Sequence, residues 1–86
     1  MLLNGKVAVI TGGARGIGRE TALLFAKEGS DIVLFDVNQE QLDKTAKEIE
    51  VLGRSTLGLV VDVTKSDQVE GAMNKTLDKF KKIDIL

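Results

Sequence analysis

Short, continuous apolar runs alternate with longer amphipathic segments along this chain of 86 residues. The runs cover residues 6–11, 31–37 and 56–63, and a fourth begins at residue 83. A continuous apolar run is typical of a strand that is buried on both faces, and strands that alternate with helices form a parallel sheet. We therefore predict one α/β domain with three layers over residues 1–86. Its sheet has the order 3-2-1-4 and is truncated after the start of the fourth strand.

The amphipathic segments carry signals for helix ends. The first spans about residues 17–28, and Gly29 after it suits the left-handed conformation that often ends a helix. The second begins at Asn38, where Gln41 three residues later nearly completes a capping box, and Ser66 can cap the third. The apolar stripe of the second helix is predicted to consist of Leu42, Ala46 and Ile49, with Leu52 as a further member.

The composition argues against several classes of site. Cysteine and histidine are absent, so neither a disulfide nor a thiolate metal site can form, and no carboxylate group has the loop spacing of a calcium site. A net charge of −1 without a basic stripe argues against a nucleic acid partner. We find no signal peptide and no apolar run long enough to span a membrane. We therefore expect a cytoplasmic protein with no metal and no membrane segment.

A glycine-rich turn connects the first predicted strand to the first predicted helix. Residues 11–18 read Thr-Gly-Gly-Ala-Arg-Gly-Ile-Gly. Glycines there permit positive φ angles and let a phosphate approach the backbone, while the N–H groups and the dipole at the helix start favour its negative charge. Many strand-to-helix turns carry glycines for geometry alone, but this setting favours a phosphate-binding turn.

One alternative is the phosphate loop of ATP and GTP hydrolases. Gly13 and Gly18 have the spacing of the two glycines in that motif. Arg19 and Glu20, however, stand where the motif has lysine and then serine or threonine, so the hydroxyl that binds magnesium is replaced by a carboxylate. This sequence therefore argues against an ATP or GTP hydrolase.

An acidic residue ends the second predicted strand. Asp36 lies 18 positions after Gly18, near the spacing at which a carboxylate accepts hydrogen bonds from the adenosine ribose of a dinucleotide. A 2′-phosphate would be repelled there, so NAD is favoured over NADP, although Arg15 in the glycine turn could accommodate that phosphate. Asp36 could instead only cap the helix that follows. We include the next residue, Val37, in the predicted site.

A second acidic residue, Asp62, ends the third predicted strand in the same way. Open parallel sheets bind their ligands at the carboxyl ends of the strands, so a ligand at this edge would pass the glycine turn, Asp36 and Asp62. Position alone leaves two interpretations equally open for Asp62, a ligand contact and a turn aspartate.

With these features the chain resembles the short-chain dehydrogenase/reductase family from residue 6 to residue 86. The turn Thr11-Gly12-x3-Gly16-x-Gly18 is similar to that family's cofactor turn, and the similarity extends to Asp36 and to the segments at 62–64 and 83–86. The resemblance implies a Rossmann-like half domain that binds a nicotinamide dinucleotide. It also implies that Asp62 and Val63 flank the adenine and that Ile17 lies on the pyrophosphate and nicotinamide side. The predicted cofactor-binding residues are Gly12, Arg15, Gly16, Ile17, Gly18, Asp36, Val37, Asp62 and Val63.

Among the members of this family, bacterial 3-oxoacyl-carrier-protein reductases and sugar dehydrogenases look most similar to this chain. The cofactor-binding half does not distinguish between these groups, so the substrate cannot be predicted from this sequence. Lys81 departs from the family, because many members have glycine there. The resemblance places the catalytic Ser, Tyr and Lys after Leu86, and the sequence contains no tyrosine. We therefore expect this chain alone to bind the cofactor without catalysing hydride transfer. A complementing C-terminal half would restore an enzyme, and a homodimer formed through the incomplete sheet edge, with little cofactor binding, is the alternative.

Overall fold

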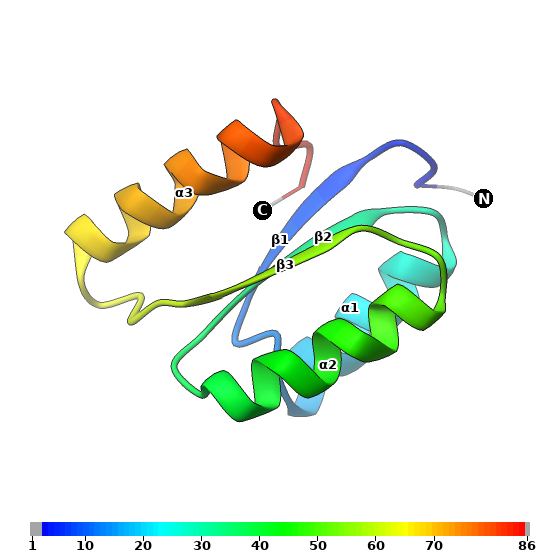
Figure 1. Ribbon diagram of the computed structural model, residues 1–86, viewed down its shortest axis with the longest axis horizontal. Coiled ribbons are helices and arrows are strands. Elements are labelled where there is room, and N and C mark those ends of the chain that lie inside the picture. The colour runs from blue at the N-terminus through cyan, green and yellow to red at the C-terminus, as the bar shows by residue number, and fades with distance from the viewer. Residues whose placement is uncertain (1–2, 86) are drawn as a thin grey trace.

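Three parallel strands lie side by side at the centre of the molecule, and helices cover both of their faces (Figure 1). This computed structural model describes residues 3–85. A strand is followed by a helix three times, in the predicted order. The elements are β1 (Val7–Thr11), α1 (Gly16–Lys27), β2 (Asp31–Asp36), α2 (Gln39–Val51), β3 (Thr56–Val60) and α3 (Ser66–Phe80).

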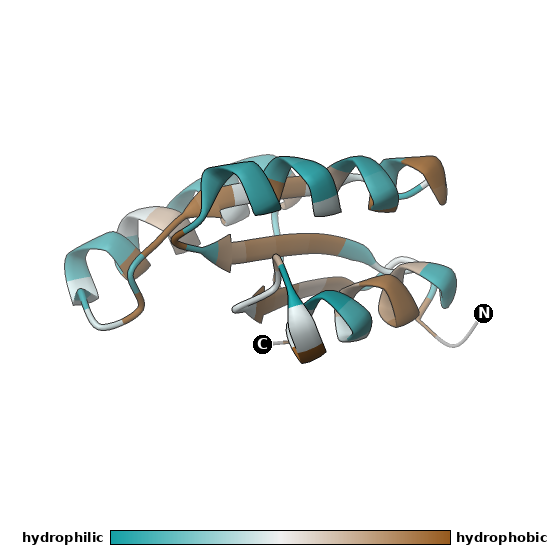
Figure 2. Ribbon diagram, turned by 90° about the horizontal axis from the view of Figure 1, so that it is seen from below, coloured by the Kyte–Doolittle hydropathy of each residue, from teal (hydrophilic) through white to brown (hydrophobic). Residues whose placement is uncertain are grey.

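Alternate residues of the strands pack into two apolar clusters, one on each face of the sheet. Ala8, Ile32 and Leu34 pack with apolar residues of α1 and α2. Val33 and Phe35 belong to the other cluster, which includes apolar residues of α3. Figure 2 shows that the strands are hydrophobic along most of their length, as burial of both faces requires. The predicted three-layer α/β fold is confirmed.

The strand β2 is central, because it pairs in parallel with β1 on one side and with β3 on the other. The sheet order 3-2-1 is therefore as predicted. At the free edge of β1 the chain returns and forms a single parallel bridge between Ala8 and Ile85, with a 2.8 Å hydrogen bond from the Val9 N–H to the Ile85 carbonyl. The described residues form no fourth strand, and Leu86 lies outside them, so the fourth strand stays a prediction.

The helix ends test the capping predictions. Gly29 has φ +99°, as the left-handed prediction requires, and the Asn38 side chain accepts a 3.0 Å hydrogen bond from the Gln41 N–H. Ser66 is not a cap, because the extended N-cap residue is Lys65 and Ser66 is already helical. The reason is a turn just before the helix, in which the Lys65 N–H donates to the Asp62 carbonyl at 2.9 Å and the chain enters the helix one residue early.

The C-terminal end of α3 carries a strained residue. Lys81 follows the helix with φ 68°, the left-handed conformation, and its N–H donates to the Leu77 carbonyl at 2.8 Å. Among residues 3–85 it is the one non-glycine residue with a positive φ angle. The position at which Lys81 departs from the family is therefore one that glycine fits better.

Candidate functional site

The three strands end at one edge of the sheet, and the predicted site residues follow them there. The register pairs Thr11 with Phe35 and Asp36 with Val60, so the carboxyl ends of the strands are level. The glycine turn extends from β1, Asp36 and Val37 end β2, and Asp62 and Val63 lie just beyond β3. The topology thus brings all of the predicted segments to this edge. The cofactor-binding role of each of these residues stays a prediction.

The glycines of the turn are required for two different reasons. Gly12 and Gly16 have φ angles of +64° and +60°, which other residues adopt only with strain. Gly18 is needed for space, because a Cβ atom there would lie 2.0 Å from the Gly12 carbonyl oxygen. Gly18 therefore lets the start of α1 lie directly against the turn.

The first turn of α1 presents free backbone donors. Gly16, Ile17 and Gly18 open the helix, and no acceptor for their N–H groups is found among the described residues. The N-cap residue Arg15 provides no side-chain cap, and the first turn contains no acidic residue. Ile17 is 87% exposed, so this helix end is open to solvent. Unpaired N–H groups and the helix dipole together favour an anion here.

Asp36 points toward the glycine turn. Its Oδ2 atom accepts a 3.2 Å hydrogen bond from the Ala14 N–H, and its Oδ1 atom accepts one of 2.7 Å from the Val37 N–H and a longer one from the Asn38 N–H. The N-cap contact to Gln41 is made by Asn38, so Asp36 is not the helix cap that the alternative interpretation suggests. Asp36 thus holds the glycine turn, and its contact with a ribose stays a prediction.

A buried threonine that the sequence analysis did not identify also contacts the turn. Thr45 of α2 is 1% exposed, and its hydroxyl donates to the Ala14 carbonyl at 2.8 Å. The predicted apolar stripe of α2 is wrong at two positions. Ala46 is only half-buried, because Thr45 takes the buried position between Leu42 and Ile49, and Leu52 is exposed at the helix end. A polar residue within an apolar stripe is the signal that could have revealed this contact.

The carboxylate of Asp62 is engaged by its own loop. Its Oδ1 atom accepts hydrogen bonds from the Thr64 hydroxyl at 2.6 Å and from the Thr64 N–H at 3.0 Å. These two bonds, the hydroxyl bond first, lower the pKa of Asp62. Its backbone N–H donates to the Gln68 side chain at 2.9 Å. Asp62 is therefore a turn aspartate, and its contact with a ligand stays a prediction. Val63 beside it is 54% exposed.

The two arginines near the turn differ in their ion pairs. Arg19 forms ion pairs with Glu48 of α2 and with Glu20, and the hydrogen bond to Glu48 is the main reason that its pKa is raised. Arg19 thus binds α1 to α2 and does not serve as a phosphate-loop lysine. Arg15 is exposed, and no carboxylate among residues 3–85 forms an ion pair with it.

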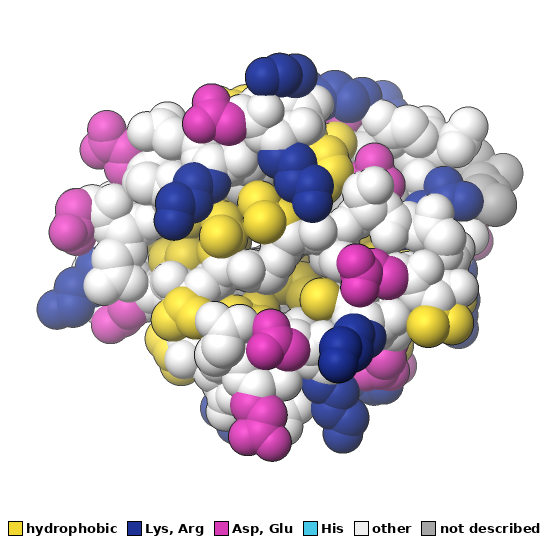
Figure 3. Space-filling model, viewed as in Figure 1, with side chains coloured by type: hydrophobic (Ala, Val, Ile, Leu, Met, Phe, Trp, Pro, Cys, Tyr) yellow, Lys and Arg dark blue, Asp and Glu magenta, His cyan; other side chains and the backbone are white. Residues whose placement is uncertain are grey.

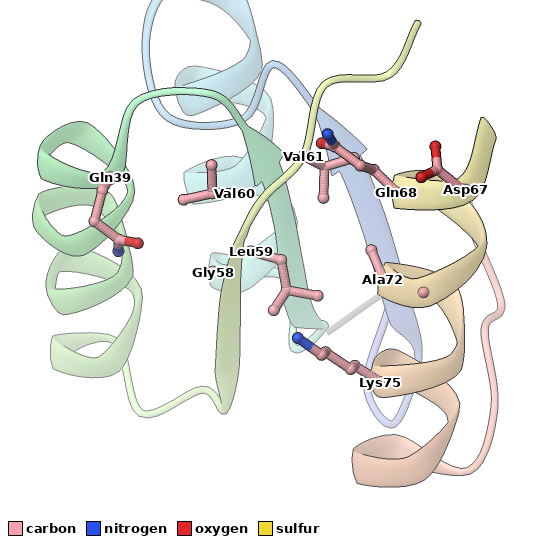
Figure 4. A pocket seen from close by; sticks show the side chains of 10 residues that line it. Gln39, Gly58, Leu59, Val60, Val61, Asp67, Gln68, Ala72 and Lys75 are labelled. Carbon is pink, nitrogen blue, oxygen red and sulfur yellow. The ribbon is translucent and has the colours of Figure 1, made fainter. Parts of the chain in front are cut away.

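A groove elsewhere on the surface contains none of the predicted residues. Figure 3 shows hydrophobic side chains in a hollow on the face seen in Figure 1. One such depression runs between β3 and α3, where Leu59 and Lys75 point toward each other and Asp67 and Gln68 lie near one end (Figure 4).

Within residues 3–85, no helix is long and apolar enough to cross a membrane, and no cluster of His, Cys, Asp or Glu residues could hold a metal ion.

Comparisons with known proteins agree with the glycine turn and its setting. The model of the short chain dehydrogenase family matches residues 6–86. The 3-oxoacyl-[acyl-carrier-protein] reductase FabG of Thermotoga maritima is 43% identical over 86 residues, and the sorbitol dehydrogenase of Cereibacter sphaeroides is 40% identical over the same length. All of this chain is covered in both cases, but only 35% and 32% of those relatives.

Solved structures give the same result. An NAD+-bound xylitol dehydrogenase matches with a TM-score of 0.96 and 37% identity, over 99% of this chain and 33% of that one. A metagenomic short-chain oxidoreductase in complex with NADP matches with a TM-score of 0.93 and 30% identity, over 100% of this chain and 39% of that one. The chain spans about a third of the length of the relatives it matches. This chain belongs to the short-chain dehydrogenase family.

Proposed function

We propose that this chain binds NAD at the carboxyl edge of its sheet and forms the cofactor-binding part of an oxidoreductase. The observation that carries the proposal is the contact between Asp36 and Ala14, which places a carboxylate at the glycine turn that leads into the unpaired N–H groups of residues 16–18. Pyrophosphate suits those N–H groups, and the ribose hydroxyls suit the carboxylate. When bound, a nicotinamide cofactor supplies hydride transfer between an alcohol and a ketone.

The hydrogen-bonding capacity of Asp36 supports the binding of such a group. A carboxylate has about four acceptor sites, and three backbone N–H groups use part of the Asp36 capacity, so a ribose hydroxyl can still donate to it. The same negative charge would repel a 2′-phosphate, which supports NAD over NADP. Arg15 is the opposing feature, since its exposed guanidinium has no carboxylate partner in the described part of the chain. Relatives with NAD+ and with NADP both resemble this fold, so the preference needs a direct measurement.

A titration of the chain with NAD and with NADP, followed by calorimetry, tests this proposal. Gly16→Ala should weaken binding, because its Cβ would project into space that is open in the protein and that the phosphate is proposed to use. Gly53→Ala is the matched control, since Gly53 also has a positive φ angle and open space but lies in the turn before β3. Absence of binding by the wild type, or equal binding by the two variants, would contradict the proposal.

We propose that the catalytic groups come from a C-terminal half, on the same or on another polypeptide. The resemblance to the family assigns catalysis to Ser, Tyr and Lys beyond residue 86, and this sequence has no tyrosine. Without a positioned acid/base, a factor of about 10²–10⁴ in rate is lost. The chain alone should therefore produce no NADH from alcohols, whereas mixing it with a chain that supplies the remaining strands should restore turnover. Persistent inactivity of a formed complex would refute complementation.

One observation favours the alternative of a homodimer. The free edge of β1 and the adjacent face of α1 form a shallow depression lined by Val9, Ile10, Thr21, Phe25 and Ile85. A second copy that pairs with β1 beyond the single Ile85 bridge would cover these apolar residues. Sedimentation that finds only monomers at high concentration would exclude this arrangement.

The absence of cysteine supports a cytoplasmic location, which fractionation of the source cells would test.

A further inference from the structure

The middle of helix α2 contains a buried hydroxyl whose partner lies outside the helix. Thr45 is 1% exposed and lies between Leu42 and Ile49, which are fully buried. Threonine is a poorer helix former than alanine, and a buried hydroxyl is unfavourable unless it is hydrogen-bonded. A helical threonine can bond back to the carbonyl of its own helix, but the Thr45 hydroxyl donates to Ala14, 31 residues away, at 2.8 Å. The bond to the glycine turn therefore accounts for a threonine at this position.

The bond orients a whole peptide group. The Ala14 carbonyl and the Arg15 N–H belong to one trans peptide plane, since no cis peptide is found among residues 3–85, and in such a plane the two groups point in opposite directions. Because Thr45 holds the carbonyl toward α2, the Arg15 N–H is directed away from α2. The preceding peptide is held separately, by the bond from the Ala14 N–H to Asp36.

We propose that Thr45 is a positioning residue that fixes the glycine turn in the conformation that accepts the dinucleotide. This inference rests on the proposed cofactor binding. Thr45 is inaccessible to a ligand, so it acts only through Ala14, which is itself fully buried. Together with Asp36 it holds both peptide groups that flank the Ala14 Cα atom, from two different elements of the fold. The turn is thereby ordered before the ligand arrives, which reduces the entropy lost on binding.

Three variants of the chain separate this role from simple packing. Thr45→Val keeps the shape and removes the hydroxyl, and it should raise the Kd for NAD by about three- to tenfold, as expected for the loss of one hydrogen bond. Thr45→Ser keeps the hydroxyl and should change the Kd by less than about twofold. Thr76→Val is the matched control, because the Thr76 hydroxyl is equally buried but bonds to Ala72 in its own helix, at 2.9 Å. It should leave the Kd unchanged.

Amide hydrogen exchange, measured by NMR without ligand, gives a second readout. Thr45→Val should speed exchange of the Ala14 N–H and move the amide signals of Arg15 and Gly16, whereas Thr76→Val should do neither. If Thr45→Val does not fold, Thr45→Ala and Thr45→Ser provide the same comparison, with Thr76→Ala as the control.

Two results would overturn the inference. One is a Thr45→Val chain that binds NAD like the wild type and shows unchanged exchange at Ala14. The other is equal weakening by Thr45→Val and Thr45→Ser, which would assign the effect to packing. If the wild type binds no dinucleotide, the proposed function fails instead, and the exchange measurement alone then decides the role of Thr45.

Discussion

Gly18→Ala should destabilise this protein more than any other single methyl group added to the glycine turn. The new Cβ atom would lie 2.0 Å from the Gly12 carbonyl oxygen and 2.7 Å from the Gly12 carbonyl carbon. Both are backbone atoms, so no side chain can rotate away and α1 must move relative to the turn. Overpacking costs about 1–3 kcal/mol where side chains can adjust, so we expect about 3 kcal/mol or more here.

Alanine substitutions at two other glycines provide comparisons for the free energy lost in Gly18→Ala. Gly16→Ala meets nothing within 4 Å and suffers only the strain of its φ angle of +60°, which costs about 1 kcal/mol. Gly71→Ala on α3 also meets nothing, has no positive φ angle, and should stabilise the helix by about 0.5–1 kcal/mol. In a chain of this size each 1 kcal/mol shifts Tm by about 4–8 °C.

Thermal unfolding followed by circular dichroism measures the series. Gly18→Ala should lower Tm by about 12 °C or more, Gly16→Ala by about 4–8 °C, and Gly71→Ala should raise it slightly. An 86-residue domain has a total stability of about 4–13 kcal/mol, so at the lower end of this range the Gly18→Ala chain is partly unfolded at room temperature, and urea titration in the cold then gives its free energy of unfolding. Equal Tm values for Gly18→Ala and Gly16→Ala would refute the close approach of α1 to the turn.

Two other substitutions test the C-terminal part of the chain. Lys81→Gly should raise the free energy of unfolding by about 0.5–1 kcal/mol in urea, because it relieves the left-handed strain while adding some backbone entropy to the unfolded chain. No gain would show that φ 68° is not strained there. The hydrogen bond from the Val7 N–H, followed by the one from Lys82, lowers the pKa of Asp84. Because the pKa of Asp84 is higher in the unfolded chain, the unfolded chain binds a proton at Asp84 more readily than the folded chain does. The stabilisation that the Asp84 carboxylate gives is therefore present above the ordinary aspartate pKa and is lost as pH falls through the lowered pKa of the folded chain. Asp84→Asn should flatten that acid dependence of unfolding, and an unchanged dependence would contradict the assignment.

The features predictable from the sequence depend on local patterns. Continuous burial of β2 over residues 32–35 follows from an apolar run that leaves no polar residue to face solvent. The Asn38 cap was predictable because its partner Gln41 is three residues away. A turn role for Asp62 was one of the two predicted interpretations. It could be predicted because the turn joins Asp62 to Thr64, only two residues away.

The features that escaped prediction depend on contacts between distant segments. Thr45 was overlooked because its partner Ala14 is 31 residues earlier and becomes adjacent only when α2 packs beside the turn. The start of α3 was placed one residue late because the bond from Lys65 to the Asp62 carbonyl sets the entry of the chain into the helix. Periodicity identifies which side of a helix is buried, but it does not show whether a polar residue there has a partner.

The double role of Asp36 changes how its substitution should be interpreted. Asp36→Ala removes the proposed ribose acceptor, but it also removes the partner of the Ala14 N–H and so loosens the turn. Loosening affects the pyrophosphate, which NAD and NADP share, whereas the ribose contact distinguishes the two cofactors. The ratio of the two Kd values therefore isolates the ribose contact, and Asp78→Ala, an exposed aspartate of α3, controls for the lost charge. If Asp36 discriminates between the cofactors, Asp36→Ala should move this ratio toward NADP by about tenfold, the equivalent of about 1.4 kcal/mol. If both Kd values rise by the same factor, Asp36 acts by holding the turn, and discrimination must come from another residue such as Arg15.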